Sequence, residues 1–356
     1  MEPQAKEFLQ TLFNTPSPSG FVEPIQQVVR DYVAPFADEV QTDVHGNVMA
    51  SKNPGSPYKI MLAGHCDQIG FIINYIDPEG FLYFLQLGGW DPQVVTGQRV
   101  VVYGKNGPVA GVIGKKAIHL LSEEERKRPT KLQDLWIDIG AKDREDAQQR
   151  VEVGDCATVE LACREMLSER ITAVATDDKV GVWVIMEALR RIDPAKLSVG
   201  VCAVSTVQEE VGLRGAKTSA FGIDPAVGIA VDVTHATDCP TVDKKQNGDI
   251  LLGAGAVLAK GPNLNTRLFN QLRAAAQEHQ IPVQIEAEGR PTGTDANVIQ
   301  VTRSGVATAL ISIPNRYMHT PTEMISLKDL DAAADLIARY CESVTPETEY
   351  IPGMGR

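Results

Sequence analysis

The sequence predicts an α/β protein that carries a small β-rich insertion. Three features predict this fold class: the length of 356 residues, strand and helix patterns that alternate in the second half, and short strands separated by turns between Gln68 and Arg164. The length alone favours two domains of about 150 residues each. We therefore expect residues 1–67 and 164–356 to form one discontinuous α/β/α domain, and residues 68–163 to form an inserted, barrel-like β domain.

Two helices and two strands are predicted before the insertion. Apolar residues recur three and four positions apart in both helices, and the break at Pro16–Gly20 separates them. The second strand runs into the motif Gly64-His65-Cys66-Asp67, which therefore lies where a buried strand ends. The four elements are expected at 8–13, 22–32, 47–51 and 59–63.

The insertion is predicted to be antiparallel. Lys105-Asn106-Gly107 is a good hairpin turn between two strand patterns. The charged stretch Ser122–Lys131 indicates an exposed loop or helix edge. Short strands are expected at 71–75, 81–85, 99–103, 109–113 and 157–161.

Beyond the insertion, strands and helices alternate, which implies α/β layers around a largely parallel sheet. Helices are expected at 179–192, 212–220, 265–280 and 327–341, and strands at 198–206, 226–233 and 307–313.

Composition excludes several classes of protein. Thirty-four Lys and Arg against 46 Asp and Glu leave a net charge of -12, which disfavours nucleic acid as a partner. The apolar stretches are shorter than the roughly 20 residues that a membrane helix needs, and the amino terminus shows no secretory signal. The six cysteines are far apart and form no C-x-x-C pair. We therefore expect a cytoplasmic protein with reduced thiols, and no membrane partner.

Acidic and imidazole side chains follow the predicted strands. Open α/β sheets place ligand sites beyond the carboxyl ends of their strands, so these residues are expected to converge on one cleft. Imidazole and carboxylate together suit zinc, cobalt or manganese. The residues are His65, Asp67, Asp177, Asp178, Glu209, Glu210, Asp232 and His319.

Taken singly, most of these residues have a purely structural explanation. Asp177 and Asp178 fit the cap of a helix, and Glu209 and Glu210 fit a solvated loop. His65 fits a structural hydrogen bond to a nearby acid, and His319 fits an exposed loop. Asp232 is the exception because it interrupts the apolar run Val227–Val231, where a lone buried carboxylate is costly without a partner or a metal.

Other motifs of enzyme chemistry are incomplete or absent. Gly212–Thr218 lacks the Gly-Lys-Ser/Thr of a phosphate-binding loop, and Gly253-Ala254-Gly255 lacks the third glycine of a dinucleotide site. The sequence contains neither G-x-S-x-G nor H-E-x-x-H. These absences disfavour a serine hydrolase and a single-helix zinc protease.

Six motifs, taken in order, closely resemble those of the glutamyl and deblocking aminopeptidases that assemble as tetrahedral particles, a group within the two-metal exopeptidases. The segment TVQEEVGLRGA at 206–216 is the most specific of them. The resemblance runs from Pro16 to the final helix. The other motifs are Ala63–Asp67, Thr176–Gly181, Val231-Asp232, Gly293–Ala296 and Arg316–Pro321.

The resemblance implies a dinuclear metalloaminopeptidase on an α/β/α catalytic domain of the two-metal exopeptidase kind. It implies two divalent ions per subunit, zinc or cobalt foremost and manganese as a further choice, with Asp177 bridging them. One ion would be held by His65, Asp177 and Asp232, and the other by Asp177, Glu210 and His319.

The resemblance also implies roles for residues that are not ligands. Glu209 would be the general base that takes a proton from the attacking water and returns it to the leaving amine. Asp67 would orient His65. The peptide bond between Asp177 and Asp178 would be cis.

By the same resemblance, the chain would form a tetrahedral dodecamer built from dimers, with residues 68–163 as the dimerisation domain. The active sites would face an internal cavity that admits short peptides and excludes folded proteins. The resemblance does not choose among acidic, basic and apolar amino-terminal residues as the preferred substrate.

Two positions depart from the usual motifs of the family. Gln68 stands where a glutamate often follows His-x-Asp, and Lys179 stands where an arginine is usual after the paired acids. Neither residue is an expected ligand. Because lysine lacks the bidentate fork of arginine, we expect the hydrogen bonding around these two residues to differ from that of relatives.

Four alternatives compete with the aminopeptidase. The same ligands would serve a carboxypeptidase or a deacylase, and a catalytically inert scaffold would keep the fold and a structural metal. A glycosidase needs two carboxylates about 5–9.5 Å apart on either side of the glycosidic bond, which the adjacent Glu209 and Glu210 do not predict. A lost ligand would favour the scaffold, but all five expected ligands and the base are present.

Overall fold

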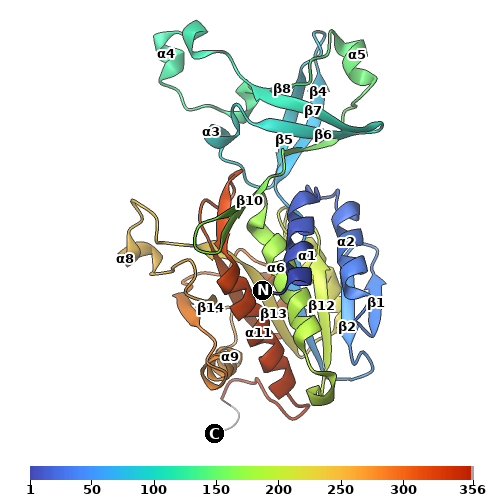
Figure 1. The fold of residues 1–356 in the computed structure, drawn as a ribbon, viewed down its shortest axis with the longest axis vertical. Coiled ribbons are helices and arrows are strands. Elements are labelled where there is room, and N and C mark those ends of the chain that lie inside the picture. Colours follow the sequence, from blue (N-terminus) through green and yellow to red (C-terminus); the bar gives the residue numbers. More distant parts are fainter. Residues whose placement is uncertain (354–356) are drawn as a thin grey trace.

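The computed structural model describes residues 1–353 and divides them into an α/β body and a β-barrel (Figure 1). The chain enters the barrel after strand β3 (Lys59–His65) and returns to the body through β10 (Cys163–Met166). This arrangement confirms the predicted fold class, an α/β/α layer structure with an inserted β-rich segment.

An eight-stranded sheet forms the centre of the body. Its order is β1-β2-β12-β3-β13-β16-β14-β15, and the four strands from β12 to β16 are mutually parallel. The edges are mixed, because β2 runs antiparallel to β12, and β14 runs antiparallel to β16 but parallel to β15. The strands other than β3 are β1 (Glu39–Thr42), β2 (Val48–Lys52), β12 (Gly200–Thr206), β13 (Val227–His235), β14 (Ala256–Lys260), β15 (Val283–Ala287) and β16 (Ala307–Asn315).

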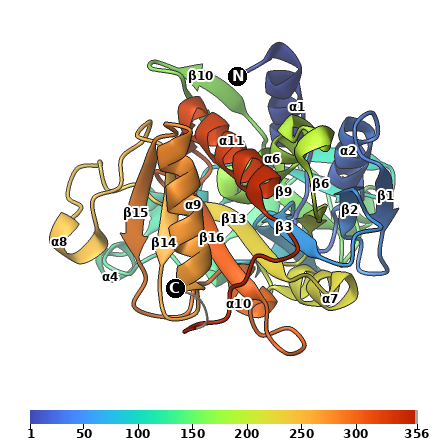
Figure 2. The ribbon, with the colours of Figure 1, turned by 90° about the horizontal axis from the view of Figure 1, so that it is seen from below.

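Helices cover both faces of this sheet, as the view from below shows (Figure 2). Alternate residues of β3 face opposite ways: Ile60 and Leu62 join the larger apolar cluster, and Met61 and Ala63 join the smaller one. The larger cluster packs under α1 (Pro3–Asn14), α2 (Glu23–Val33), α6 (Thr176–Arg191), α9 (Thr266–Glu278) and α11 (Leu327–Ser343). The smaller cluster packs under α7 (Arg214–Ile223) and α10 (Ala296–Ile299).

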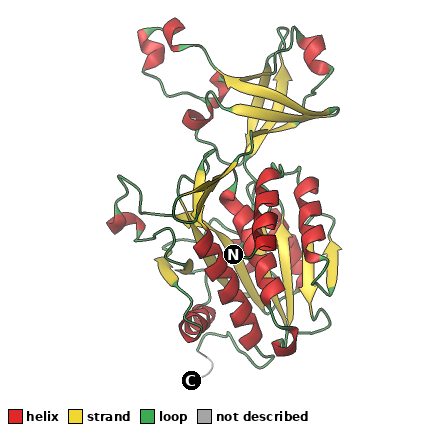
Figure 3. Ribbon diagram, viewed as in Figure 1, coloured by secondary structure: helices red, strands yellow, loops and turns green. Residues whose placement is uncertain are grey.

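The barrel is closed, with the strand order β4-β5-β8-β7-β6-β9, and it has an apolar core of its own (Figure 3). The hairpin predicted at Lys105-Asn106-Gly107 joins β6 to β7. The strands are β4 (Gly70–Ile76), β5 (Leu82–Leu87), β6 (Arg99–Gly104), β7 (Gly107–Gly114), β8 (Trp136–Asp138) and β9 (Cys156–Val159), and the short helices are α3 (Pro92–Val95), α4 (Glu123–Arg126) and α5 (Arg144–Gln148).

Three further short strands form a small sheet in the order β10-β11-β17, with β11 at Arg170–Ala173 and β17 at Glu323–Ser326. Helix α8 spans Lys244–Asn247. The six cysteines are free thiols. Within residues 1–353, no helix combines the length and the apolar character that crossing a membrane requires.

The sequence patterns predicted the central strands of the eight-stranded sheet but missed β1, β14 and β15, and outside this sheet they missed β8, β10, β11 and β17. All of these strands are short, and β15 lies at the edge of the sheet, where half-exposed residues such as Gln284 and Glu286 interrupt any apolar period. The pairing of β14 and β15 is set by neighbours distant in the chain, which local pattern does not report.

Helix α6 lies unusually close to β3. A Cβ built on Gly64 would meet the carbonyl carbon of Gly181 at 2.6 Å and the amide nitrogen of Val182 at 2.8 Å. Because these are backbone atoms, they have no rotamer with which to move aside. The two glycines thus bring the first turn of α6 to the end of β3.

Replacing Gly64 with alanine is expected to destabilise the protein by about 1–3 kcal/mol, because the added methyl forces the helix away from the sheet. Gly222→Ala is the matched control, since a Cβ at that helical position meets nothing within 4 Å. Thermal melting of both variants checks this, and equal melting temperatures would contradict the close packing.

Candidate metal centre

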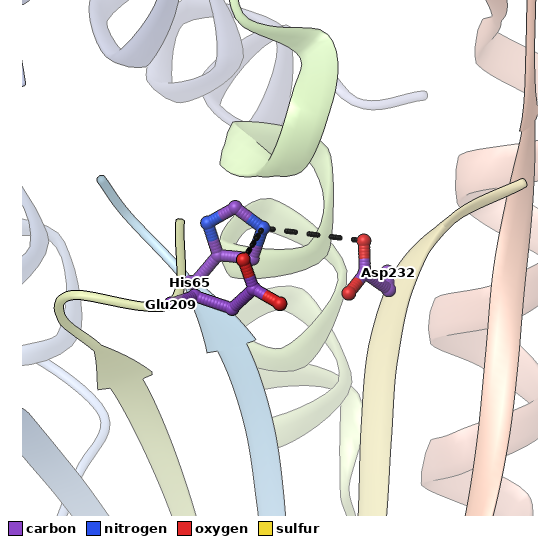
Figure 4. Close-up of side chains that lie close together, drawn as sticks. All are labelled: His65, Glu209 and Asp232. Carbon is purple, nitrogen blue, oxygen red and sulfur yellow. Dashed lines mark ion pairs between the residues drawn. The ribbon is translucent and has the colours of Figure 1, made fainter. Parts of the chain in front are cut away.

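The predicted site residues come together at the carboxyl edge of the parallel strands. His65 ends β3, Glu209 and Glu210 follow β12, and Asp232 lies near the end of β13. Figure 4 shows the side chains of His65, Glu209 and Asp232 pointing toward one another, His65 from β3, Asp232 from β13 and Glu209 from the loop after β12. Asp177, in the first turn of α6, and His319, in the loop after β16, complete the set.

Asp177 lies between the two imidazoles. Its Oδ1 is 3.2 Å from Nε2 of His65, and its Oδ2 is 3.2 Å from Nε2 of His319. Each oxygen of one carboxylate therefore contacts a different histidine. A carboxylate in this position can bridge two cations that each bind one imidazole.

Each imidazole also has its own acidic neighbours. Nε2 of His65 is 3.7 Å from Oε2 of Glu209 and 4.0 Å from Oδ1 of Asp232. Nε2 of His319 is 3.8 Å from Oε2 of Glu210. Two groups of potential ligands result: His65, Glu209 and Asp232 in one, and Asp177, Glu210 and His319 in the other, each with its ligand atoms within 4.8 Å of one another.

The orientation of His65 comes from the backbone of Asp67. Nδ1 of His65 lies 2.9 Å from the carbonyl oxygen of Asp67, whereas the nearest oxygen of the Asp67 carboxylate is 3.7 Å away. This contact leaves Nε2 as the ring nitrogen that faces the acids. The Asp67 carboxylate has another task, since it accepts the backbone N–H groups of Glu209 at 3.0 Å and Glu210 at 3.3 Å.

The carboxylates of the site are buried close to one another. In the protein alone, burial raises the pKa of Glu209 to about 10 and that of Asp232 to about 8, and neighbouring acids add to both shifts. Burial likewise raises the pKa of Glu210 to about 8. Bringing several ionised carboxylates together out of water is unfavourable unless cations lie among them.

Asp177 differs from these acids because it has cationic partners. Burial by itself would raise its pKa, but hydrogen bonds from His319 and His65 outweigh this and hold the pKa below its usual range. The same hydrogen bond to Asp177 raises the pKa of His319 to about 9. Asp177 is therefore the most strongly ionised carboxylate of the site.

The residues fit a pair of divalent cations. Imidazole nitrogens and carboxylate oxygens are the donors that zinc, cobalt and manganese accept. Oε1 of Glu210 is buried without a hydrogen-bond partner, as expected of an atom placed to bind a cation.

Asp178 lies outside the cluster of ligands and serves the backbone. The Asp177–Asp178 peptide bond is cis, as the resemblance implied. Asp178 Oδ2 accepts the N–H of His65 at 3.2 Å, and Oδ1 accepts the N–H of Gly181 at 2.9 Å. It thereby ties the end of β3 to the start of α6.

Glu323, on β17, is a site residue that the sequence patterns missed. It is 2% exposed, and Oε2 accepts the N–H of Asp177 at 3.1 Å while Oε1 accepts the N–H of His319 at 2.8 Å. One buried acid thus fixes the backbone of two potential ligands. The only signal in the sequence is an acid four residues after His319, in a segment too short to show a strand period.

Gln68 and Lys179, the two departures from the family motifs, contact each other. The ammonium of Lys179 donates to Oε1 of Gln68 at 2.9 Å and to the carbonyl of Thr15 at 2.7 Å. Both side chains are fully buried, and burial lowers the pKa of Lys179 to about 7. A neutral acceptor thus faces the Lys179 ammonium in the buried interior.

A cavity of about 600 Å³ opens over the site. Both histidines of the centre line it, together with Asp177, Asp232 and the Glu209-Glu210 pair. The fold and the site thus define an α/β/α protein whose largely parallel sheet presents a candidate metal centre in a cavity at its carboxyl edge.

The chain belongs to the M42 glutamyl aminopeptidase family, whose sequence model matches residues 46–336. It is 35% identical to the lysyl aminopeptidase of Pyrococcus furiosus over 345 residues, which are 96% of this chain and 97% of that one. Membership identifies the protein as an aminopeptidase.

Solved structures agree with this assignment. A TET aminopeptidase from the marine sediment archaeon Thaumarchaeota archaeon SCGC AB-539-E09 has a TM-score of 0.91 and 35% identity, with 97% of each chain covered. The TET1 peptidase of Pyrococcus horikoshii, described as able to assemble into a tetrahedron or a large octahedral shell, has a TM-score of 0.85 and 30% identity, with 96% of this chain and all of that chain covered.

Proposed function

We propose that this chain is a dinuclear metalloaminopeptidase that removes amino-terminal residues from short peptides. The observation that carries the proposal is the Asp177 carboxylate, whose two oxygens each contact one imidazole. His65, Asp177 and Asp232 would hold one ion, and Asp177, Glu210 and His319 the other. Zinc or cobalt fits these donors best, and manganese is also accepted by them.

Divalent ions bound there would lower the pKa of a water and polarise the scissile carbonyl. The chain's own contribution is a base. With Asp177 shared, each ion takes one histidine and one terminal carboxylate, Asp232 or Glu210, and this leaves Glu209 over. Its side chain lines the cavity, where its carboxylate can accept a proton from water and then donate it to the leaving amine.

Other amide hydrolases are a weaker interpretation. A carboxypeptidase or a deacylase could use the same ligands, but the family and the lysyl aminopeptidase relative favour attack beside a free α-amine. A glycosidase would leave both histidines and Asp232 without a role. An inert scaffold would have no role for Glu209, because this carboxylate is not needed to bind either metal ion.

We propose that copies of this chain assemble through the barrel. Residues 68–163 would act as a dimerisation domain, and dimers would build a tetrahedral dodecamer, because the similar TET1 peptidase of Pyrococcus horikoshii can assemble into a tetrahedron. Twelve copies of a 38.6 kDa chain weigh about 460 kDa, which light scattering can test against a mass near 39 kDa for a monomer. Large apolar side chains exposed on this segment support the proposal: Tyr75, Tyr83, Leu85, Val112, Ile118, Leu120 and Val153.

A cytoplasmic location is part of the proposal, because six free thiols fit a reducing compartment. The substrate would be a short peptide, and the net charge of -12 continues to disfavour nucleic acid.

Mass spectrometry of a mixed short-peptide library tests the reaction itself. Metal-loaded enzyme is expected to remove single residues from free amino termini and to spare acetylated ones. Chelation should abolish cleavage, and zinc or cobalt should restore it. Cleavage at carboxyl termini, or release of acyl groups, would instead establish one of the alternatives.

The roles of Glu209 and Glu210 are separable by substitution. Glu209→Gln is expected to lower kcat by about 10²–10⁴-fold, the contribution of a general base, while zinc affinity measured by chelator competition stays close to that of the native chain. Glu210→Gln should weaken zinc binding, because it removes a ligand. If both variants lose zinc equally, Glu209 is a ligand and not the base.

A further inference from the structure

The catalytic cavity extends past the metal centre to the end of β15. Glu286 and Glu288 line this part, and neither belongs to the groups of potential ligands. Figure 2 shows β15 next to β14 at one edge of the sheet. Side chains on β15 therefore approach the cavity from the side opposite β3 and β12.

Glu286 is held beside the metal centre with one oxygen unused. Its Oε1 accepts a hydrogen bond of 2.9 Å from Oγ1 of Thr234, while Oε2 is buried without a partner. Thr234 lies two residues after Asp232 on β13, so both side chains point to the same face of the sheet. The carboxylate of Glu286 is thus next to the metal centre but separate from it.

Ser312, on β16, presents a second unpartnered polar atom to the same cavity. The residue is 1% exposed, and its Oγ has no hydrogen-bond partner. Leaving a buried donor or acceptor unpaired costs about 1–3 kcal/mol. A polar ligand bound in this cavity would supply the hydrogen bonds that these two atoms lack.

The acidic lining of this part of the cavity favours a cationic ligand. Among the described residues that line the cavity, none is Lys or Arg, and Glu288 adds a further acid. Burial raises the pKa of Glu286, and the nearby Glu288 raises it further. A cation placed here would offset the repulsion between the carboxylates of Glu286 and Glu288 and would pair with Oε2 of Glu286. A carboxylate would add to the repulsion.

We propose that this part of the cavity is the subsite for the side chain of the amino-terminal residue, and that Glu286 makes it select lysine or arginine. The inference rests on the proposed aminopeptidase reaction, since it names the substrate class of that same site. Glu286 would accept a charge-assisted hydrogen bond on Oε2, and Ser312 would supply a second polar contact. Glutamyl and aspartyl peptides would be repelled.

Matched aminoacyl anilides test the subsite on the metal-loaded, full-length enzyme. Lysine and norleucine have the same unbranched chain and differ by the ammonium group, so the ratio of their kcat/KM values isolates the charge. The native enzyme is expected to prefer lysine and arginine over norleucine, and to act least on glutamate. Glu286→Gln should lower the lysine to norleucine ratio about tenfold or more, because a charge-assisted hydrogen bond is lost.

Glu278→Gln is the control, because it removes an equal charge from an exposed position at the end of α9. It should leave the ratio as in the native enzyme. The proposed subsite is overturned if the native lysine to norleucine ratio is at or below one, or if Glu286→Gln leaves this ratio unchanged. In either case, cleavage of the norleucine anilide would still support the aminopeptidase reaction. Failure to cleave any of the anilides or library peptides overturns both.

Discussion

The contact of one carboxylate with two imidazoles, at Asp177, depends on backbone positions that other buried acids hold. Asp67 accepts two N–H groups after β12, Asp178 accepts the N–H at the end of β3, and Glu323 accepts the N–H groups of both Asp177 and His319. Each of these acids is satisfied by the backbone and does not face the centre as a ligand. The carboxylates of Glu209, Glu210 and Asp232 instead face the centre, where burial raises the pKa of each. The contrast separates acids that position the backbone from acids that face the potential metal sites.

The same edge of the sheet explains how so many acids can gather. Parallel strands end together, so β3, β12 and β13 deliver side chains to one place, and the close approach of α6 at Gly64 adds Asp177 from the non-helical start of α6. Repulsion among the inward carboxylates opposes this arrangement in the protein alone. Divalent cations would offset the repulsion, which links occupancy of the centre to the stability of this edge.

Acidic residues also line the cavity beyond the metal centre. Glu286 and Glu288 continue it along the cavity, where no backbone N–H or cationic side chain within the described residues neutralises Oε2 of Glu286. After the end of β3, by contrast, the buried ammonium of Lys179 faces the neutral side-chain oxygen of Gln68 and not a carboxylate.

The central strands and the long helices of the α/β domain, and the candidate site residues at their ends, could be predicted from the sequence by itself, because periodicity and motif spacing are local properties. All the predicted ligands, from His65 to His319, accordingly lie together in the structure. Only the tertiary structure decided which atoms meet: the carbonyl of Asp67 on His65, Glu323 beneath two potential ligands, Lys179 against Gln68, and Glu286 beside Thr234. These contacts join residues on separate strands and loops, and strand order in a sheet is set by packing across the whole chain, which no local pattern records.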